Sequence, residues 1–212
     1  MEINQLIGIH AEQPLPHQLL MSWLKGYKRP NDKILGLKAQ GILESLKKGL
    51  YIAGPSVTDN KPDVMLVANH LLGPSYVSME TALSYYGLIP ERVYETSSMT
   101  TKASRSFNTA LGLFTYTRLS LPYYSFGLQM LRLPTNQYVM VASPEKALCD
   151  KIVTTSGLTL RGLRSAYDYL VDDMRIDESV LKDLNTNMIK EWLDDAPKKD
   201  SLLMVVKMIE QL

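Results

Sequence analysis

The sequence predicts an α/β (α+β) protein: a short N-terminal unit of helices that ends in a hairpin, then a mixed α+β domain whose C-terminal part is helical. Apolar residues recur at helical spacing near the N-terminus, and segments rich in Tyr, Thr, Phe and Val gather at about 93–141. Helical patterns return from about 143 to 212. With 212 residues, 45% of them hydrophobic and 21% charged, the chain is long enough to bury the core that this fold needs.

The N-terminal unit is expected to contain three helices and a hairpin, at residues 3–9, 15–25, 31–39 and 42–53. Pro14 and Pro16 break the chain between the first two helices. Asn31 or Asp32 caps the third helix, and Gly41 closes it. Short helices followed by a hairpin within about 55 residues are typical of a winged helix-turn-helix, so residues 1–54 are assigned to this motif.

The hairpin is the most informative part of this unit. Its tip, Lys47-Lys48-Gly49, places two positive charges where a winged helix touches the phosphate backbone of DNA. By itself the segment also fits any β-hairpin with a solvated turn, because runs of charge are usually solvated. Its place after three helices and before a proline-containing linker favours the wing.

A linker at 55–62, with two prolines and several polar residues, leads to the second unit at 63–212. This unit should open with a helix at 64–72 and a second helix that Ser78 caps and Gly87 ends. Strands are expected at 93–99, 111–119, 128–133 and 137–141. Ser143 and Pro144 begin a helix to about Thr154. Three or four further helices follow, with breaks near Asp173, Asn185–Asn187 and Pro197.

Few residues have the spacing that catalysis requires. Cys149 lies in an apolar pattern with no histidine nearby in the sequence, so it is interpreted as a small core residue. The three histidines have no metal-ligand spacing. Lys146 and Asp150 lie four residues apart on one helix and fit an ordinary surface ion pair. We therefore expect no catalytic residue, no metal site, no cofactor and no enzymatic activity.

The same features predict a cytoplasmic protein. A single cysteine cannot form a disulfide within the chain, which suits a reducing compartment. The segment Met1–Asn4 lacks the basic-then-apolar layout of a signal peptide. No apolar run approaches the ~20 residues of a membrane span, so no membrane contact is expected.

The charge distribution favours nucleic-acid contact by one end of the molecule. Residues 1–54 contain seven Lys or Arg and four Asp or Glu, a net charge of +3, whereas the whole chain carries +1. On the outward face of the third helix, Gly36 and Ala39 would allow close approach, but Asp32 would repel phosphate and no arginine is present to read guanine. The candidate DNA-binding residues are Lys28, Arg29, Asn31, Lys33, Gln40, Lys47 and Lys48. A winged helix that binds protein is the alternative.

Two further groups of residues lie in the second unit. Clustered tyrosines can stack single-stranded bases, but within strands and an apolar helix they more often form a core, which is the interpretation favoured here. These tyrosines are residues 85, 86, 94, 116, 123 and 124. Lys102, Arg105 and Arg118 flank them and could form a second basic surface on or near the strands.

Three segments together resemble the AbiEi family of antitoxins, which belong to bacterial toxin–antitoxin pairs linked to abortive phage infection. The hairpin segment Gly41–Tyr51 is similar to the family's G-x-L-x-x-x-x-x-G-L-Y wing. The segment Tyr76–Leu88 looks like the helix that opens the family's second domain, and Ala142–Asp150 is similar to its A-T/S-P-E-K/R-A-L-x-D helix start. The three segments occur in family order between about residues 41 and 150, while 155–212 match less clearly.

The resemblance implies a DNA-binding antitoxin that represses its own operon through the winged helix. It implies double-stranded DNA of the protein's own promoter as a partner, with a homodimer on that DNA as one arrangement. It also implies a functional partner, a toxin of nucleotidyltransferase type that the second domain counters. Lys47 and Lys48 correspond to wing residues and 31–40 to the recognition helix. The alternatives are a stand-alone winged-helix transcriptional regulator and a protein-binding module that uses the winged helix.

Overall fold

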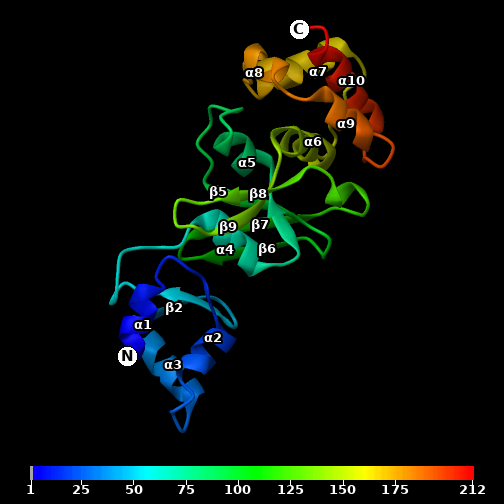
Figure 1. The fold of residues 1–212 in the computed structure, drawn as a ribbon. Coiled ribbons are helices and arrows are strands. Elements are labelled where there is room, and N and C mark those ends of the chain that lie inside the picture. The colour runs from blue at the N-terminus through cyan, green and yellow to red at the C-terminus, as the bar shows by residue number, and fades with distance from the viewer. Residues whose placement is uncertain (1) are drawn as a thin grey trace.

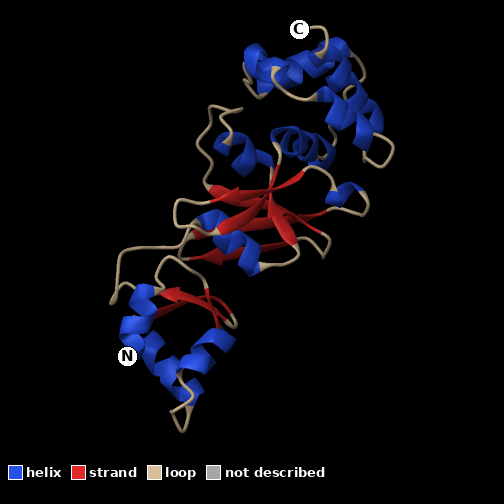
Figure 2. Ribbon diagram, viewed as in Figure 1, coloured by secondary structure: helices blue, strands red, loops and turns tan. Residues whose placement is uncertain are grey.

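The computed structural model describes residues 2–212. Met1, the first residue of the expected N-terminal unit, lies outside the described residues. Helices and strands are mixed along the chain, which confirms the α+β class. Figures 1 and 2 show a small unit of helices and short strands at the N-terminal end, and a larger sheet with helices that extends to the C-terminus.

The small unit contains three helices and a three-stranded antiparallel sheet with the order β1-β3-β2. Its elements are α1 (Ile3–Ile9), β1 (Leu15–Pro16), α2 (His17–Trp23), α3 (Pro30–Ala39), β2 (Leu43–Lys47) and β3 (Leu50–Ala53). The expected helix at 15–25 was wrong at its start, because Leu15 and Pro16 pair with Tyr51 and Leu50 of β3. Proline lacks the N–H of a helix interior but tolerates the position that precedes one.

The third helix begins one residue before the expected caps. Pro30 occupies its first turn, where the missing N–H is not needed, and Arg29 precedes it without a side-chain cap. The end of α3 is as expected, since Gly41 adopts a left-handed φ of 68° that favours glycine. Ile34 and Leu37 are buried with Leu20 of α2 and with Leu24, the residue after that helix, in one apolar core.

The larger unit is built on a six-stranded mixed sheet with the order β6-β7-β5-β4-β9-β8. The strands are β4 (Ser75–Val77), β5 (Glu95–Thr100), β6 (Arg105–Thr109), β7 (Gly112–Arg118), β8 (Leu128–Arg132) and β9 (Tyr138–Ala142). Strand pairs β5–β7 and β4–β9 are parallel, and the others are antiparallel. Four strands match the expected ones, whereas β4 lies before the expected strand region and β6 falls between two expected strands, where no element was assigned.

Helices cover both faces of this sheet. Helix α4 (Val64–Leu71) accepts a hydrogen bond at the carbonyl of Ala68 from the Tyr116 hydroxyl of β7, at 2.6 Å. The Tyr76 hydroxyl of β4 points to the opposite face and donates to Asp150 of α6 (Pro144–Thr154) at 3.0 Å. Helix α5 (Met79–Tyr85) packs beside α6 on that second face, as Figure 2 shows.

The C-terminal part is helical, as expected. It contains α7 (Leu163–Tyr167), a π-helical segment (Asp168–Asp173), α8 (Glu178–Lys182), α9 (Thr186–Trp192) and α10 (Lys199–Ile209). The expected start of α6 is confirmed, because the Ser143 side chain accepts a hydrogen bond from the backbone N–H of Lys146. In Figure 1 these helices stack beyond α6, on the side away from the N-terminus.

The hairpin of β2 and β3 joins the two units. Leu46, Leu50 and Ile52 are buried in the apolar core of the larger unit, although they belong to the sheet of the smaller one. Ala53 at the end of β3 is buried in the smaller core. Between the units, Lys61 of the linker donates to the carbonyl of Ala53 at 3.1 Å. The hairpin is therefore a shared element rather than a projection into solvent.

Candidate nucleic-acid interface

Helix α3 exposes one full face to solvent. Ile34 and Leu37 are buried, while Asn31, Asp32 and Leu35 are exposed. A methyl group placed on Gly36 would meet no atom within 4 Å, so the helix backbone is open to a partner at this position. Leu35, which was not among the residues expected on the outward face, is 63% exposed. The exposed face combines polar, acidic and apolar groups.

The turn before α3 carries two of the candidate cations. Lys28 and Arg29 are both exposed, and Figure 1 shows this turn at the end of the small unit that lies away from the sheet. Arg29 lies 3.7 Å from the Asp32 carboxylate, and both side chains are mostly exposed. Because an exposed pair of this length is weak, Arg29 remains available to a stronger anion.

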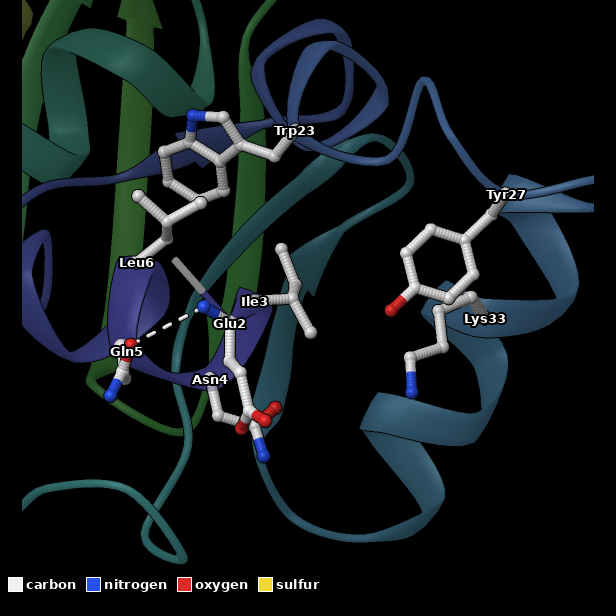
Figure 3. Close-up of a pocket in the computed structure, with 8 residues that line it drawn as sticks. All are labelled: Glu2, Ile3, Asn4, Gln5, Leu6, Trp23, Tyr27 and Lys33. Carbon is white, nitrogen blue, oxygen red and sulfur yellow. Dashed lines mark hydrogen bonds between the residues drawn. The ribbon is translucent and has the colours of Figure 1, made fainter.

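Lys33 faces a pocket between α1 and α3. Figure 3 shows Tyr27 and Lys33 on one side of this pocket and Glu2, Asn4 and Gln5 on the other. The ammonium group of Lys33 lies 5.6 Å from the centre of the Tyr27 ring, a distance at which the ring attracts a cation. The pocket has a volume of about 620 Å³. Lys33 is thus positioned beside the exposed face of α3 rather than at its centre.

The two lysines of the hairpin have different surroundings. Lys48 is exposed at the two-residue turn, where Gly49 adopts a φ of 82°. Lys47 is half-buried, and its ammonium group donates to the carbonyl of Leu71 at the end of α4. Burial lowers the pKa of Lys47, and the neighbouring charges of Lys102 and Arg105 lower it further.

The second basic group therefore lies next to the hairpin. Lys102 and Arg105 follow the end of β5, and β2 contacts β6 directly. Both side chains are exposed, as is Arg118, which pairs with Thr100 in the sheet. None of the three takes part in an ion pair among the described residues. Lys48, Lys102, Arg105 and Arg118 are called the junction cations below.

The structure thus divides the candidate residues between two places. Lys28, Arg29, Asn31 and Lys33 gather at the N-terminal end of α3, and Lys47 and Lys48 lie at the hairpin beside the larger unit. Gln40 is exposed at the other end of α3, about 15 Å away along a ten-residue helix. Its carbonyl accepts a hydrogen bond from the Ser56 hydroxyl at 2.8 Å, which fixes the linker against the helix end.

A second polar group is enclosed within the larger unit. Lys146 and Asp150, expected on the surface, are both fully buried, so that expectation was wrong. The ammonium group of Lys146 lies 3.0 Å from Asp150 Oδ1 and donates to the carbonyl of Tyr123 at 2.9 Å. Asp150 Oδ2 accepts from the hydroxyls of Tyr76 and Ser78, at 3.0 and 2.7 Å.

The buried network of Lys146 and Asp150 holds elements of the larger unit together and is closed to substrates. Burial lowers the pKa of Lys146 and raises the pKa of Asp150, and each charge partly reverses the shift of the other. Neither side chain is exposed, so a substrate cannot reach them without local opening. The network fixes α6 to β4 and to the segment around Tyr123.

The cysteine and the clustered tyrosines agree only in part with the expectation that they lie in the core. Cys149 is fully buried, which confirms the core interpretation, and burial raises the pKa of its thiol. Among residues 2–212, no group of three or more His, Cys, Asp or Glu is arranged to hold a metal ion. Tyr116, Tyr123 and Tyr124 are buried, but Tyr85 and Tyr94 are exposed. Within the described part of the chain, no helix is both long and apolar enough to cross a membrane.

No model of a known protein family matches the chain, and no curated protein matches it either. The likeness to the AbiEi antitoxins therefore rests on the three sequence segments alone.

Proposed function

We propose that the N-terminal unit is a winged helix-turn-helix and that the protein is a DNA-binding antitoxin of the cytoplasm that represses its own operon. The observation that carries the proposal is the exposed face of α3, which stands on the apolar core of the small unit, together with the exposed Lys48 at the turn of the hairpin. A helix of ten residues with one free face has the size that the major groove admits.

In this proposal α3 lies in the major groove. Asn31 can hydrogen-bond to base edges, and Lys28 and Arg29 contact phosphates at the same end of the helix. Gln40 lies nine residues further along, on the opposite flank of α3, so it can contact only the other wall of the groove. Lys48, at the turn of the hairpin, contacts the phosphate backbone of the DNA, as the wing of this motif does. The junction cations on the larger unit would extend this contact, because Lys102 and Arg105 lie close enough to Lys47, the neighbour of Lys48, for their charges to lower its pKa.

Binding to the protein's own promoter across a series of salt concentrations tests the DNA contact. Lys48→Ala should weaken binding and reduce the slope of log affinity against log salt by about 0.9, the value for one phosphate contact. Lys47→Ala should change the slope less, because the Lys47 ammonium group already bonds to the Leu71 carbonyl. Lys207→Ala, an exposed lysine of α10, serves as the control. An unchanged slope in Lys48→Ala contradicts the wing assignment.

The antitoxin part depends on a partner toxin of nucleotidyltransferase type. Its support is the resemblance of the three segments in family order. Co-expression with the product of the adjacent reading frame tests it: growth arrest by that product alone, relieved by this protein, is the expected result. If the adjacent reading frame encodes no such protein, the stand-alone transcriptional regulator becomes the better proposal.

A protein-binding winged helix is the second candidate, and Leu35 favours it. This leucine is 63% exposed on α3 beside Asp32, an arrangement that suits a protein surface better than phosphate. Leu35→Glu separates the two uses, since it should abolish a protein contact made by α3. If α3 binds DNA, Leu35→Glu should reduce the affinity for DNA. The slope of log affinity against log salt should then change by no more than about 0.9, the value for one phosphate contact.

A further inference from the structure

A groove at the start of β5 collects exposed apolar side chains of the larger unit. It has a volume of about 500 Å³ and lies between α4, α5 and the segment that leads into β5. Val64, Tyr85 and Tyr94 line it, with exposed fractions of 39, 49 and 83%. Leu111, in the turn that precedes β7, also lines it. Exposed aromatic and aliphatic residues gathered in one place mark an interaction site more often than scattered ones do.

A second cavity of about 330 Å³ adjoins this groove and shares Arg92, Val93 and Glu95 with it. Its walls are apolar at Ile89 and Met174, and its rim is acidic. The rim contains four carboxylates and two cations, Glu80, Glu91, Glu95, Asp173, Arg92 and Lys151. With Arg175, which pairs with Glu91, its net charge is −1.

Two of these carboxylates have no cation of their own. Glu80 is paired with Lys151, and Glu91 is paired with Arg175. Glu95 and Asp173 form no ion pair among the described residues. Arg92 does not neutralise them by an ion pair, since its guanidinium lies 5.5 Å from the Tyr94 ring centre. Glu95 lines both cavities and therefore stands where a cation entering the groove would meet it.

The groove is separate from the basic junction. Strand β5 runs from Glu95 to Thr100; Arg118 pairs with Thr100 at the far end, and Lys102 follows that end. Five residue steps of an extended strand span roughly 17 Å. The acidic rim would repel a phosphate backbone, so a nucleic acid is the wrong occupant for this end of β5.

We propose that this groove docks a protein partner that presents an arginine or lysine side chain next to an aromatic or aliphatic one. The apolar side chain fills the space between Tyr85 and Tyr94. The cation reaches Glu95 and Asp173, where its charge is complementary to the rim. This surface is independent of the proposed DNA contact.

The test uses two synthetic tripeptides as probes, acetyl-Arg-Tyr-Arg-amide and acetyl-Glu-Tyr-Glu-amide, with the isotope-labelled full chain followed by NMR. We expect the basic peptide to shift the amide signals of Thr81, Tyr94 and Glu95 in a saturable way. The acidic peptide should bind at least about tenfold more weakly than the basic one. Glu95→Lys should invert this preference, and Glu95→Gln should remove it. Tyr138→Ala, an exposed tyrosine on β9 outside the groove, should leave it unchanged.

Several outcomes would overturn the proposal. Equal binding of the two peptides, shifts at other residues, or no effect of Glu95→Lys would each do so. Shifts of the same amides on raising the protein concentration alone would assign the groove to a second copy of the chain. Shifts caused by a duplex oligonucleotide would assign it to nucleic acid. Because Glu95→Lys should retain promoter binding and Lys48→Ala should retain peptide binding, failure here is distinguishable from failure of the proposed function.

Discussion

Gly127 shows how closely one residue can be enclosed. It adopts a φ of 61°, and a methyl group on it would lie 2.7 Å from Lys146 Cβ and 2.7 Å from the Trp192 ring. Gly157 has a similar φ of 72° but no atom within 4 Å of such a methyl group. Gly157→Ala should lower the free energy of unfolding by about 1–2 kcal/mol through backbone strain alone. Gly127→Ala should lower it by a further ~1–3 kcal/mol.

Urea unfolding of both glycine variants measures this difference. Equal losses in the two would mean that the space around Gly127 is not fixed by α6 and Trp192.

The buried ion pair makes a prediction about pH. Lys146→Met leaves the Asp150 carboxylate buried without its cation, and should lower the free energy of unfolding by about 3–5 kcal/mol at neutral pH. Burial already raises the pKa of Asp150 above its unfolded value. The stability that its protonation contributes is therefore complete below about pH 3.9 and is lost as pH rises through the higher folded pKa.

Urea unfolding between about pH 4 and pH 8 checks the sign, because Asp titrates near the lower limit when unfolded. Lys146→Met should lose stability as pH rises. In the double variant Lys146→Met/Asp150→Asn this loss should disappear, since the amide does not titrate. The same pH profile in both variants would exclude Asp150 as the titrating group.

Two pairs of residues show which properties of single side chains could not be predicted from the sequence. The spacing of Lys146 and Asp150 predicts their ion pair but not the side of the helix that is buried, because that depends on what β4 and the Tyr123 segment place against it. The two charges at 47 and 48 are likewise equivalent in sequence. Only the position of the Leu71 carbonyl distinguishes them.

At the scale of elements, the hairpin supports two cores at once. Leu50 is 3% exposed and belongs to the core of the larger unit. Leu50→Ala should lower the free energy of unfolding by about 2–5 kcal/mol, because it leaves a cavity between the units. Leu35→Ala removes the same atoms from an exposed site and should change the free energy of unfolding by less than about 0.5 kcal/mol. Thermal or urea unfolding compares them, and a small effect of Leu50→Ala would mean that the hairpin is not anchored.

Elements with strong end signals could be predicted from sequence, and those defined by pairing could not. The helix after Ser143 and the closure of α3 at Gly41 follow from local chemistry. Strand β6, by contrast, lies at a sheet edge and has one hydrophobic residue, Phe107, so its sequence shows no alternation of apolar and polar residues. Strand β4 has three residues, all buried, and is too short to show a period.

At the scale of the molecule, two tryptophans report on the two units separately. Trp23 packs against the smaller core and Trp192 belongs to the larger one. Because the hairpin contributes to both cores, we expect the variants Trp23→Phe and Trp192→Phe to give the same fluorescence midpoint in urea. Adding Leu50→Ala should separate the two midpoints. Distinct midpoints without that change would show that the units unfold independently.

The position of β3 has a further consequence. It is the central strand of the small sheet, and its side chains reach both cores, so its backbone amides should exchange with solvent only when the whole molecule opens. A protease that cuts the linker at 55–62 would then leave a nicked protein whose two fragments stay associated and migrate as one species under native conditions.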